Sequence, residues 1–130
     1  MIKGFSLDIY DCDIAFAWDT NEKELNGLLD KAGATDEDRK DFFDHIRERD
    51  LQAVTVGMGT TLIAIVFKCE PTEKVVAHEI FHAAYRCLQA RGIEDEESYA
   101  YTIGHITGMF YELFRSDEPG DSFEEPEPIK

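Results

Sequence analysis

The chain has 130 residues, with 28 acidic and 13 basic side chains and a formal net charge of −15 at pH 7. This length suits one domain, and a hydrophobic content of 43%, with 12% aromatic residues, is enough to build a packed core. The negative charge repels phosphate backbones and anionic lipid, so it argues against nucleic-acid and membrane partners.

We expect neither a targeting segment nor a membrane segment. Residues 1–4 open into mixed polar sequence without the apolar run of a signal peptide, and no stretch approaches the ~18 apolar residues of a membrane span. The three cysteines, Cys12, Cys69 and Cys87, form no C-x-x-C pair, which excludes a zinc ribbon or a thioredoxin-like motif. We expect three buried thiols in a reducing compartment, and therefore a cytoplasmic protein.

The beginning of the chain predicts a β-hairpin and then a helix. Apolar residues alternate in part over residues 5–18, and a break at residues 11–13 indicates the turn between two short strands. Asn21 and Glu24 have the spacing of a capping box ahead of leucines at helical spacing. Gly33 then provides a C-terminal stop.

A second helix is predicted after Thr35, where three consecutive acidic residues suit the positive end of the helix dipole. Its apolar stripe contains Phe42, Phe43 and Ile46. His45 lies beside that stripe among charged residues, and we interpret it as a surface or boundary histidine.

The strongest strand is predicted over residues 60–67. A β-branched run over residues 52–56 and a turn over residues 57–59 precede it, which indicates a second hairpin. The turn lacks the G-x-x-x-x-G-K pattern of a phosphate-binding loop. The order of strands, two helices, strands and two helices predicts an α+β fold for a single domain over residues 1–115, with two short hairpins or a mixed sheet packed on the last two helices.

Two more helices and a tail complete the chain. Pro71 is tolerated at a helix N-terminus, Gly92 is a stop, and the broad apolar face between them predicts a central, largely buried helix. The acidic run over residues 94–97 opens a last helix that ends near Phe114. Residues 116–130 hold three prolines and six carboxylates, so we predict a disordered acidic tail.

The central helix carries the most informative motif, His78-Glu79-Ile80-Phe81-His82, which reads H-E-x-x-H. Helical positions i and i+4 lie on one face, so His78 and His82 can direct two imidazoles at one zinc ion. Glu79 projects roughly 100° round the helix from His78, which suits a general base beside the metal.

A third ligand is expected downstream, because a catalytic zinc usually has three protein ligands and one open position. The short loop at Gly92 would bring the last helix back as an antiparallel neighbour of the motif helix. Glu97, Tyr101 and His105 are four residues apart and form one polar stripe on that helix. A zinc site would explain this stripe on a helix otherwise built for burial.

H-E-x-x-H followed by E-x-x-A on the next helix resembles the signature of the gluzincin class of zinc peptidases. The short gap between His82 and Glu97 and the small size are similar to the minimal gluzincins and to small predicted metallopeptidases of phage and prophage genomes. The resemblance covers about residues 60–113. It implies a small zincin-like domain in which His78, His82 and Glu97 bind zinc and Glu79 is the catalytic base.

The chain departs from that class in some respects. Larger gluzincins often carry an acid, bonded to a zinc-binding histidine, where Tyr101 stands; the tyrosine hydroxyl either orients such a histidine or only packs. Glu96 competes with Glu97 as ligand, and the E-x-x-A spacing favours Glu97. His105 either stabilises a developing oxyanion, supports the ligands or is a core histidine. No H-x-x-G-x-x-H follows, which excludes a metzincin.

The sequence therefore predicts a zinc metallopeptidase that hydrolyses bonds of a peptide or protein substrate. Zinc would polarise the scissile carbonyl and lower the pKa of its water, and Glu79 would pass the water proton to the leaving amine. Two alternatives remain: a zinc-binding but catalytically silent regulatory protein, and an interaction protein whose His-Glu stripe is ordinary surface. The strand over residues 60–67 is either an edge strand that pairs with an extended substrate or a core strand.

Overall fold

The computed structural model describes residues 1–48, 52–58 and 61–115. Four α-helices and one four-stranded mixed sheet confirm the α+β class within this part of the chain. The predicted acidic tail over residues 116–130 lies outside the described residues. No helix in the described ranges is long and apolar enough to cross a membrane.

Both predicted hairpins are present, and they join in one sheet with the strand order β1-β2-β4-β3. β1 (Ile2–Leu7) pairs antiparallel with β2 (Cys12–Trp18), and β3 (Ala53–Met58) pairs antiparallel with β4 (Leu62–Phe67). β2 and β4 run parallel at the centre. Two helices intervene between these strands, which supplies the long connection that a parallel pair needs.

The first turn lies earlier than predicted. A single 3₁₀ turn over Asp8–Tyr10 and a left-handed Asp11 (φ 51°) connect the strands, and Cys12 and Asp13 already belong to β2. A short polar side chain such as aspartate tolerates this conformation better than most residues, because it can hydrogen-bond locally.

The strand predicted over residues 60–67 is a core strand. β4 pairs with β2 on one side and β3 on the other, and all six of its residues are buried. The edge-strand interpretation of this segment is therefore wrong. Within the described residues, β3 pairs with β4 alone and has its other edge free. Continuous apolar runs suit strands buried on both faces, which explains the strong signal of β4.

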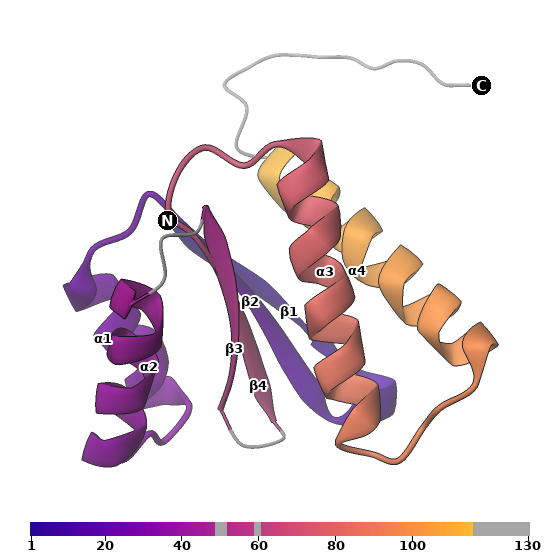
Figure 1. The fold of residues 1–130 in the computed structure, drawn as a ribbon, viewed down its shortest axis with the longest axis horizontal. Helices are drawn as coiled ribbons and strands as arrows, with labels where there is room; N and C mark the ends of the chain where they lie inside the picture. The colour runs from indigo at the N-terminus through magenta and orange to yellow at the C-terminus, as the bar shows by residue number, and fades with distance from the viewer. Residues whose placement is uncertain (49–51, 59–60, 116–130) are drawn as a thin grey trace.

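Two helices cover each face of the sheet (Figure 1). α1 (Glu22–Lys31) and α2 (Asp36–Glu48) lie on one face, and α3 (Glu73–Gln89) and α4 (Glu96–Arg115) lie side by side on the other. Side chains alternate between the two faces of the sheet along β4, so that Ile63 and Ile65 pack against α3 and α4 whereas Val66 packs against α1 and α2. Each such side chain stabilises the fold by roughly 1.5–3 kcal/mol when fully buried.

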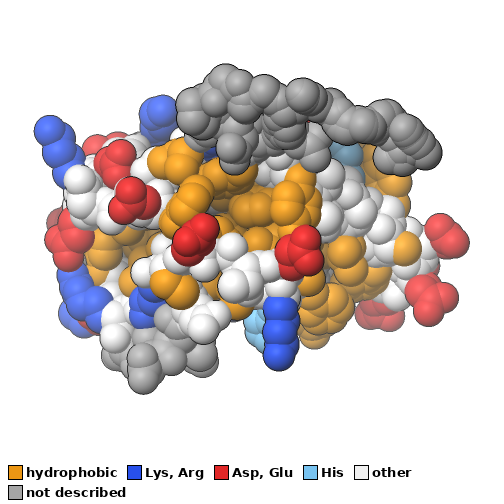
Figure 2. All heavy atoms as spheres, turned by 90° about the horizontal axis from the view of Figure 1, so that it is seen from above, with side chains coloured by type: hydrophobic (Ala, Val, Ile, Leu, Met, Phe, Trp, Pro, Cys, Tyr) orange, Lys and Arg blue, Asp and Glu red, His pale blue; other side chains and the backbone are white. Residues whose placement is uncertain are grey.

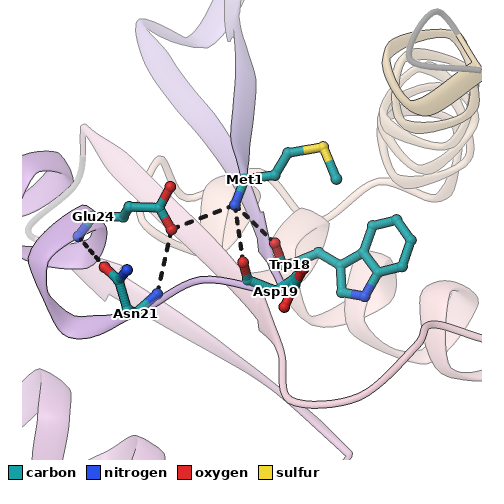
Figure 3. Close-up of polar contacts among 5 residues, drawn as sticks. All are labelled: Met1, Trp18, Asp19, Asn21 and Glu24. Carbon is teal, nitrogen blue, oxygen red and sulfur yellow. Dashed lines mark hydrogen bonds and ion pairs between the residues drawn. The ribbon is translucent and has the colours of Figure 1, made fainter. Parts of the chain in front are cut away.

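The predicted capping box at the start of α1 is confirmed (Figure 3). The Asn21 side chain accepts from the Glu24 backbone N–H at 2.9 Å, and the Glu24 carboxylate accepts from the Asn21 N–H at 3.3 Å. The same carboxylate lies 3.5 Å from the amino group of Met1, which also donates to the carbonyls of Trp18 and Asp19. This cluster ties the start of β1 to the end of β2 and to α1.

α3 is anchored on the sheet at its C-terminal end. Arg91 donates to the backbone oxygens of Tyr10 at 2.6 Å, Cys87 at 2.9 Å and Asp11 at 3.3 Å, which joins the helix to the first turn.

The buried Cys12 and Cys87 thiols are hydrogen-bonded, and this bond together with burial raises the pKa of Cys12. The expectation of three buried thiols is wrong for one of them, because Cys69 is exposed.

Charged side chains surround the apolar layers. Figure 2 looks onto the end of the molecule where α3 begins and shows hydrophobic side chains gathered between acidic and basic side chains. Near this end, Trp18 of β2 packs against Phe114 of α4 with ring centroids 5.8 Å apart. The last turn of α4 therefore contributes to the core that positions α3.

Gly4 allows a close approach between the first two strands and provides a test of the sheet. A Cβ at this position would lie 2.6 Å from the Ile14 carbonyl oxygen, which is backbone and moves only with β2. We expect Gly4→Val to destabilise the protein by about 1–3 kcal/mol in urea unfolding. Gly27→Ala in α1 is the control: a Cβ there meets nothing within 4 Å. It should stabilise by about 0.5–1 kcal/mol. Equal stability of both variants would contradict this account of β1.

Candidate metal site

His78 and His82 converge on the exposed flank of α3. Their Nε2 atoms are 3.2 Å apart, and their rings meet edge to face with centroids 4.7 Å apart. Both side chains are accessible to solvent, because the helical period turns the apolar residues of α3 toward the sheet instead. The i, i+4 spacing thus achieves the convergence that the sequence predicted.

This separation can be compared with the geometry of zinc. A tetrahedral zinc ion with Zn–N distances of about 2.0–2.1 Å separates two ligand nitrogens by about 3.3 Å. The observed 3.2 Å between the Nε2 atoms of His78 and His82 is close to that value. The same distance also suits a hydrogen bond from one ring N–H to the other ring nitrogen. Metal titration separates these two arrangements.

Glu79 lies beneath the two histidines and is held in place. Its side chain is only 8% exposed, and one carboxylate oxygen, Oε1, accepts from the Thr55 hydroxyl at 2.7 Å. Thr55 also donates to the Glu79 backbone oxygen at 3.2 Å. The other oxygen, Oε2, lies 3.9 Å from His78 Nε2. A buried carboxylate needs such a partner, and the bond leaves Oε2 beside the imidazoles.

The position of Thr55 explains this contact. Side chains alternate along β3, so Thr55 and Ala53 face α3 whereas Val54 faces α2. The sequence interpretation did not include Thr55, because its 24-residue separation from Glu79 carries no local signal. A lone polar residue on the buried face of an otherwise apolar strand is the one sequence feature that distinguishes it.

An open hollow of about 310 Å³ lies in front of the histidines, along β3. His78, Glu79 and His82 line it from α3, together with Arg86, and His45 lines it from α2. His45, which the sequence predicts to be a surface or boundary histidine, is partly buried and lies at this hollow. Arg86 was missed, although it continues the four-residue spacing of His78 and His82 and could have been found from that pattern.

Of the residues predicted on α4, Tyr101 and His105 lie away from the histidine pair. Glu96 and Glu97 are exposed in its first turn, which contacts the end of α3 through a hydrogen bond from Gln89 to Tyr99. The Tyr101 ring stacks on His105, and His105 in turn contacts Phe5 of β1. β1 and β3 are opposite edges of the sheet, so Tyr101 and His105 are not brought to the His78–His82 pair.

The described residues contain no group of three or more His, Cys, Asp or Glu side chains arranged to hold a metal ion. Of the predicted ligands, the structure brings His78 and His82 together, and Glu97 as third ligand stays a prediction. No family model matches the chain, and no similar curated protein or solved structure was found.

Zinc titration tests the histidine pair directly. We expect one zinc ion per chain in calorimetry, with a rise in melting temperature on saturation. His78→Ala and His82→Ala should each weaken binding at least about tenfold, since each removes a coordinating nitrogen. His105→Ala is the matched control, because this histidine packs against Phe5 at the other edge of the sheet. Unchanged affinity in both histidine variants would show that the pair is only hydrogen-bonded.

Proposed function

We propose that the chain is a zinc-dependent peptidase. The observation that carries the proposal is the convergence of His78 and His82, 3.2 Å apart, beside a buried carboxylate that Thr55 holds. An open hollow along the free edge of β3 adjoins these groups and gives an extended peptide a place to lie. The resemblance of the H-E-x-x-H and E-x-x-A motifs to gluzincins supports the same chemistry.

His78 and His82 would hold the metal, with Glu97 proposed as the third ligand. The first turn of α4 lies against the end of α3, as the hydrogen bond between Gln89 and Tyr99 demonstrates, so Glu97 is on the neighbouring element. His45 is an alternative that emerges from the structure alone, because it lines the same hollow as the histidine pair.

Glu79 is the general base in this proposal. Zinc, when bound, supplies a Lewis acid that polarises the scissile carbonyl and lowers the pKa of water. The Glu79 carboxylate accepts the proton of the attacking water and donates it to the leaving amine. The Thr55 hydroxyl fixes Oε1, so that Oε2 keeps its orientation toward His78 through the reaction.

Replacement of the base separates metal binding from catalysis. Glu79→Gln keeps the size of the side chain and a hydrogen-bonding partner for Thr55 but removes the proton acceptor. We expect zinc affinity within about threefold of wild type and a loss of peptide hydrolysis of at least about 100-fold, the usual scale for general-base catalysis. Cleavage of a peptide library, read by mass spectrometry, measures the difference. Zinc binding by the wild type without cleavage of any peptide would instead favour the catalytically silent alternative.

The third ligand can be identified by comparing three variants. If Glu97 coordinates the metal, Glu97→Ala should lower zinc affinity about 10- to 100-fold, while Glu96→Ala and His45→Ala leave it within about threefold. Glu96 is the matched control, since it is the adjacent exposed carboxylate in the same helical turn. Loss of zinc affinity in His45→Ala alone would indicate that His45 of α2, and not Glu97 of α4, is the third ligand.

A further inference from the structure

Arg86 occupies a central place along the edge of β3. The hollow in front of the histidine pair is flanked by two others, one of about 260 Å³ toward α2 and one of about 510 Å³ toward the end of α3. Arg86 lines all three. A substrate that lies along this edge and extends from His82 toward the end of α3 would therefore meet the guanidinium group.

The guanidinium group is available for a ligand. The Arg86 side chain is exposed, and none of the hydrogen bonds or ion pairs found among the described residues engages its guanidinium group. Other arginines are occupied: Arg39 bonds to Asn26 and Arg47 pairs with Glu22 at 2.9 Å. A cation without a carboxylate partner is unexpected on a chain with 28 acidic and 13 basic residues. Arg86 thus provides a local positive charge within a strongly negative surface.

We propose that Arg86 binds a carboxylate of the peptide substrate and so determines which peptides are cleaved; this rests on the proposed peptidase function. Guanidinium groups hold carboxylates through two parallel hydrogen bonds, which provides orientation as well as affinity. The carboxylate is either the C-terminal group of a short peptide or the side chain of an aspartate or glutamate.

The spacing along α3 defines where that carboxylate lies. Arg86 follows His82 by one helical turn, about 6 Å along the axis at 1.5 Å per residue. Two residues of an extended peptide span about 6.6 Å, so the carboxylate belongs within about two residues of the scissile bond. The neighbouring hollow also carries Asp38 and Asp41 of α2, which would repel an acidic group that strays from Arg86.

Matched peptides test the proposal and distinguish the two sources of the carboxylate. One set has a free C-terminal carboxylate or its amide two residues after the scissile bond, and the other has an internal glutamate or glutamine with a blocked end. The wild type should prefer one acidic member by about 10- to 100-fold in kcat/KM, the scale of a charge-assisted hydrogen bond. Arg86→Gln should remove this preference mainly through KM, and Arg86→Lys should restore it in part. Arg47→Gln is the control for loss of one positive charge.

Binding measurements keep this proposal separate from the peptidase proposal. Calorimetry of the zinc-loaded Glu79→Gln chain with each acidic peptide and its neutral partner requires no turnover. Preference for one acidic peptide that disappears when Arg86→Gln is added supports the role of Arg86, even if the wild type cleaves nothing. Equal binding of acidic and neutral peptides, or a preference that survives Arg86→Gln, overturns that role, even if the wild type is an active peptidase.

Discussion

The burial of one face of α3 on the sheet is the constraint on which the rest of the structure depends. Ile80, Ala83 and Leu88 are fully buried, and the two adjacent alanines let the helix lie close to the strands. Once these residues face inward, the period of 3.6 residues per turn fixes the directions of the other side chains of α3. His78 and His82 must lie on the exposed flank, and Glu79 must lie between them and the sheet.

That placement buries the carboxylate of Glu79, and Thr55 of β3 provides a hydrogen-bond donor for it. A carboxylate removed from water costs several kcal/mol unless it is hydrogen-bonded, and Thr55 supplies the donor. Thr55 stands on the α3 face of β3 because strand alternation is strict. The contact therefore links the position of Glu79 to the register of the β3–β4 pair, in which Thr55 is paired with Ile65. A shift of one residue in this register would turn the hydroxyl away from Glu79.

Among the described strands, β3 lies at the edge of the sheet beside the candidate site. β4, whose sequence predicts a strand more strongly, is enclosed by β2 and β3 and belongs to the core. The hollow beside β3 combines imidazole, carboxylate and guanidinium groups from α3 with His45 from α2. Both helical layers of the domain thus contribute to one open surface, although they cover opposite faces of the sheet.

Local patterns were sufficient for the elements themselves. The capping box at Asn21, the stop at Gly33 and the apolar period of α3 depend on neighbours in sequence, so both hairpins, all four helices and the α+β class followed from them. The i, i+4 spacing likewise predicted that His78 and His82 converge. The strand order could not be predicted from the sequence, because the pairing of β2 with β4 depends on contacts between residues about 50 positions apart.

What only the tertiary structure decided is which separated residues meet. The sequence by itself determined two convergent imidazoles and a glutamate one position along the same helix. The folded chain added Thr55 and His45, and it placed the stacked Tyr101 and His105 at the opposite edge of the sheet. The physical reason is that helical spacing is a local property of the backbone, whereas the partner of a buried face depends on how sheet and helices pack.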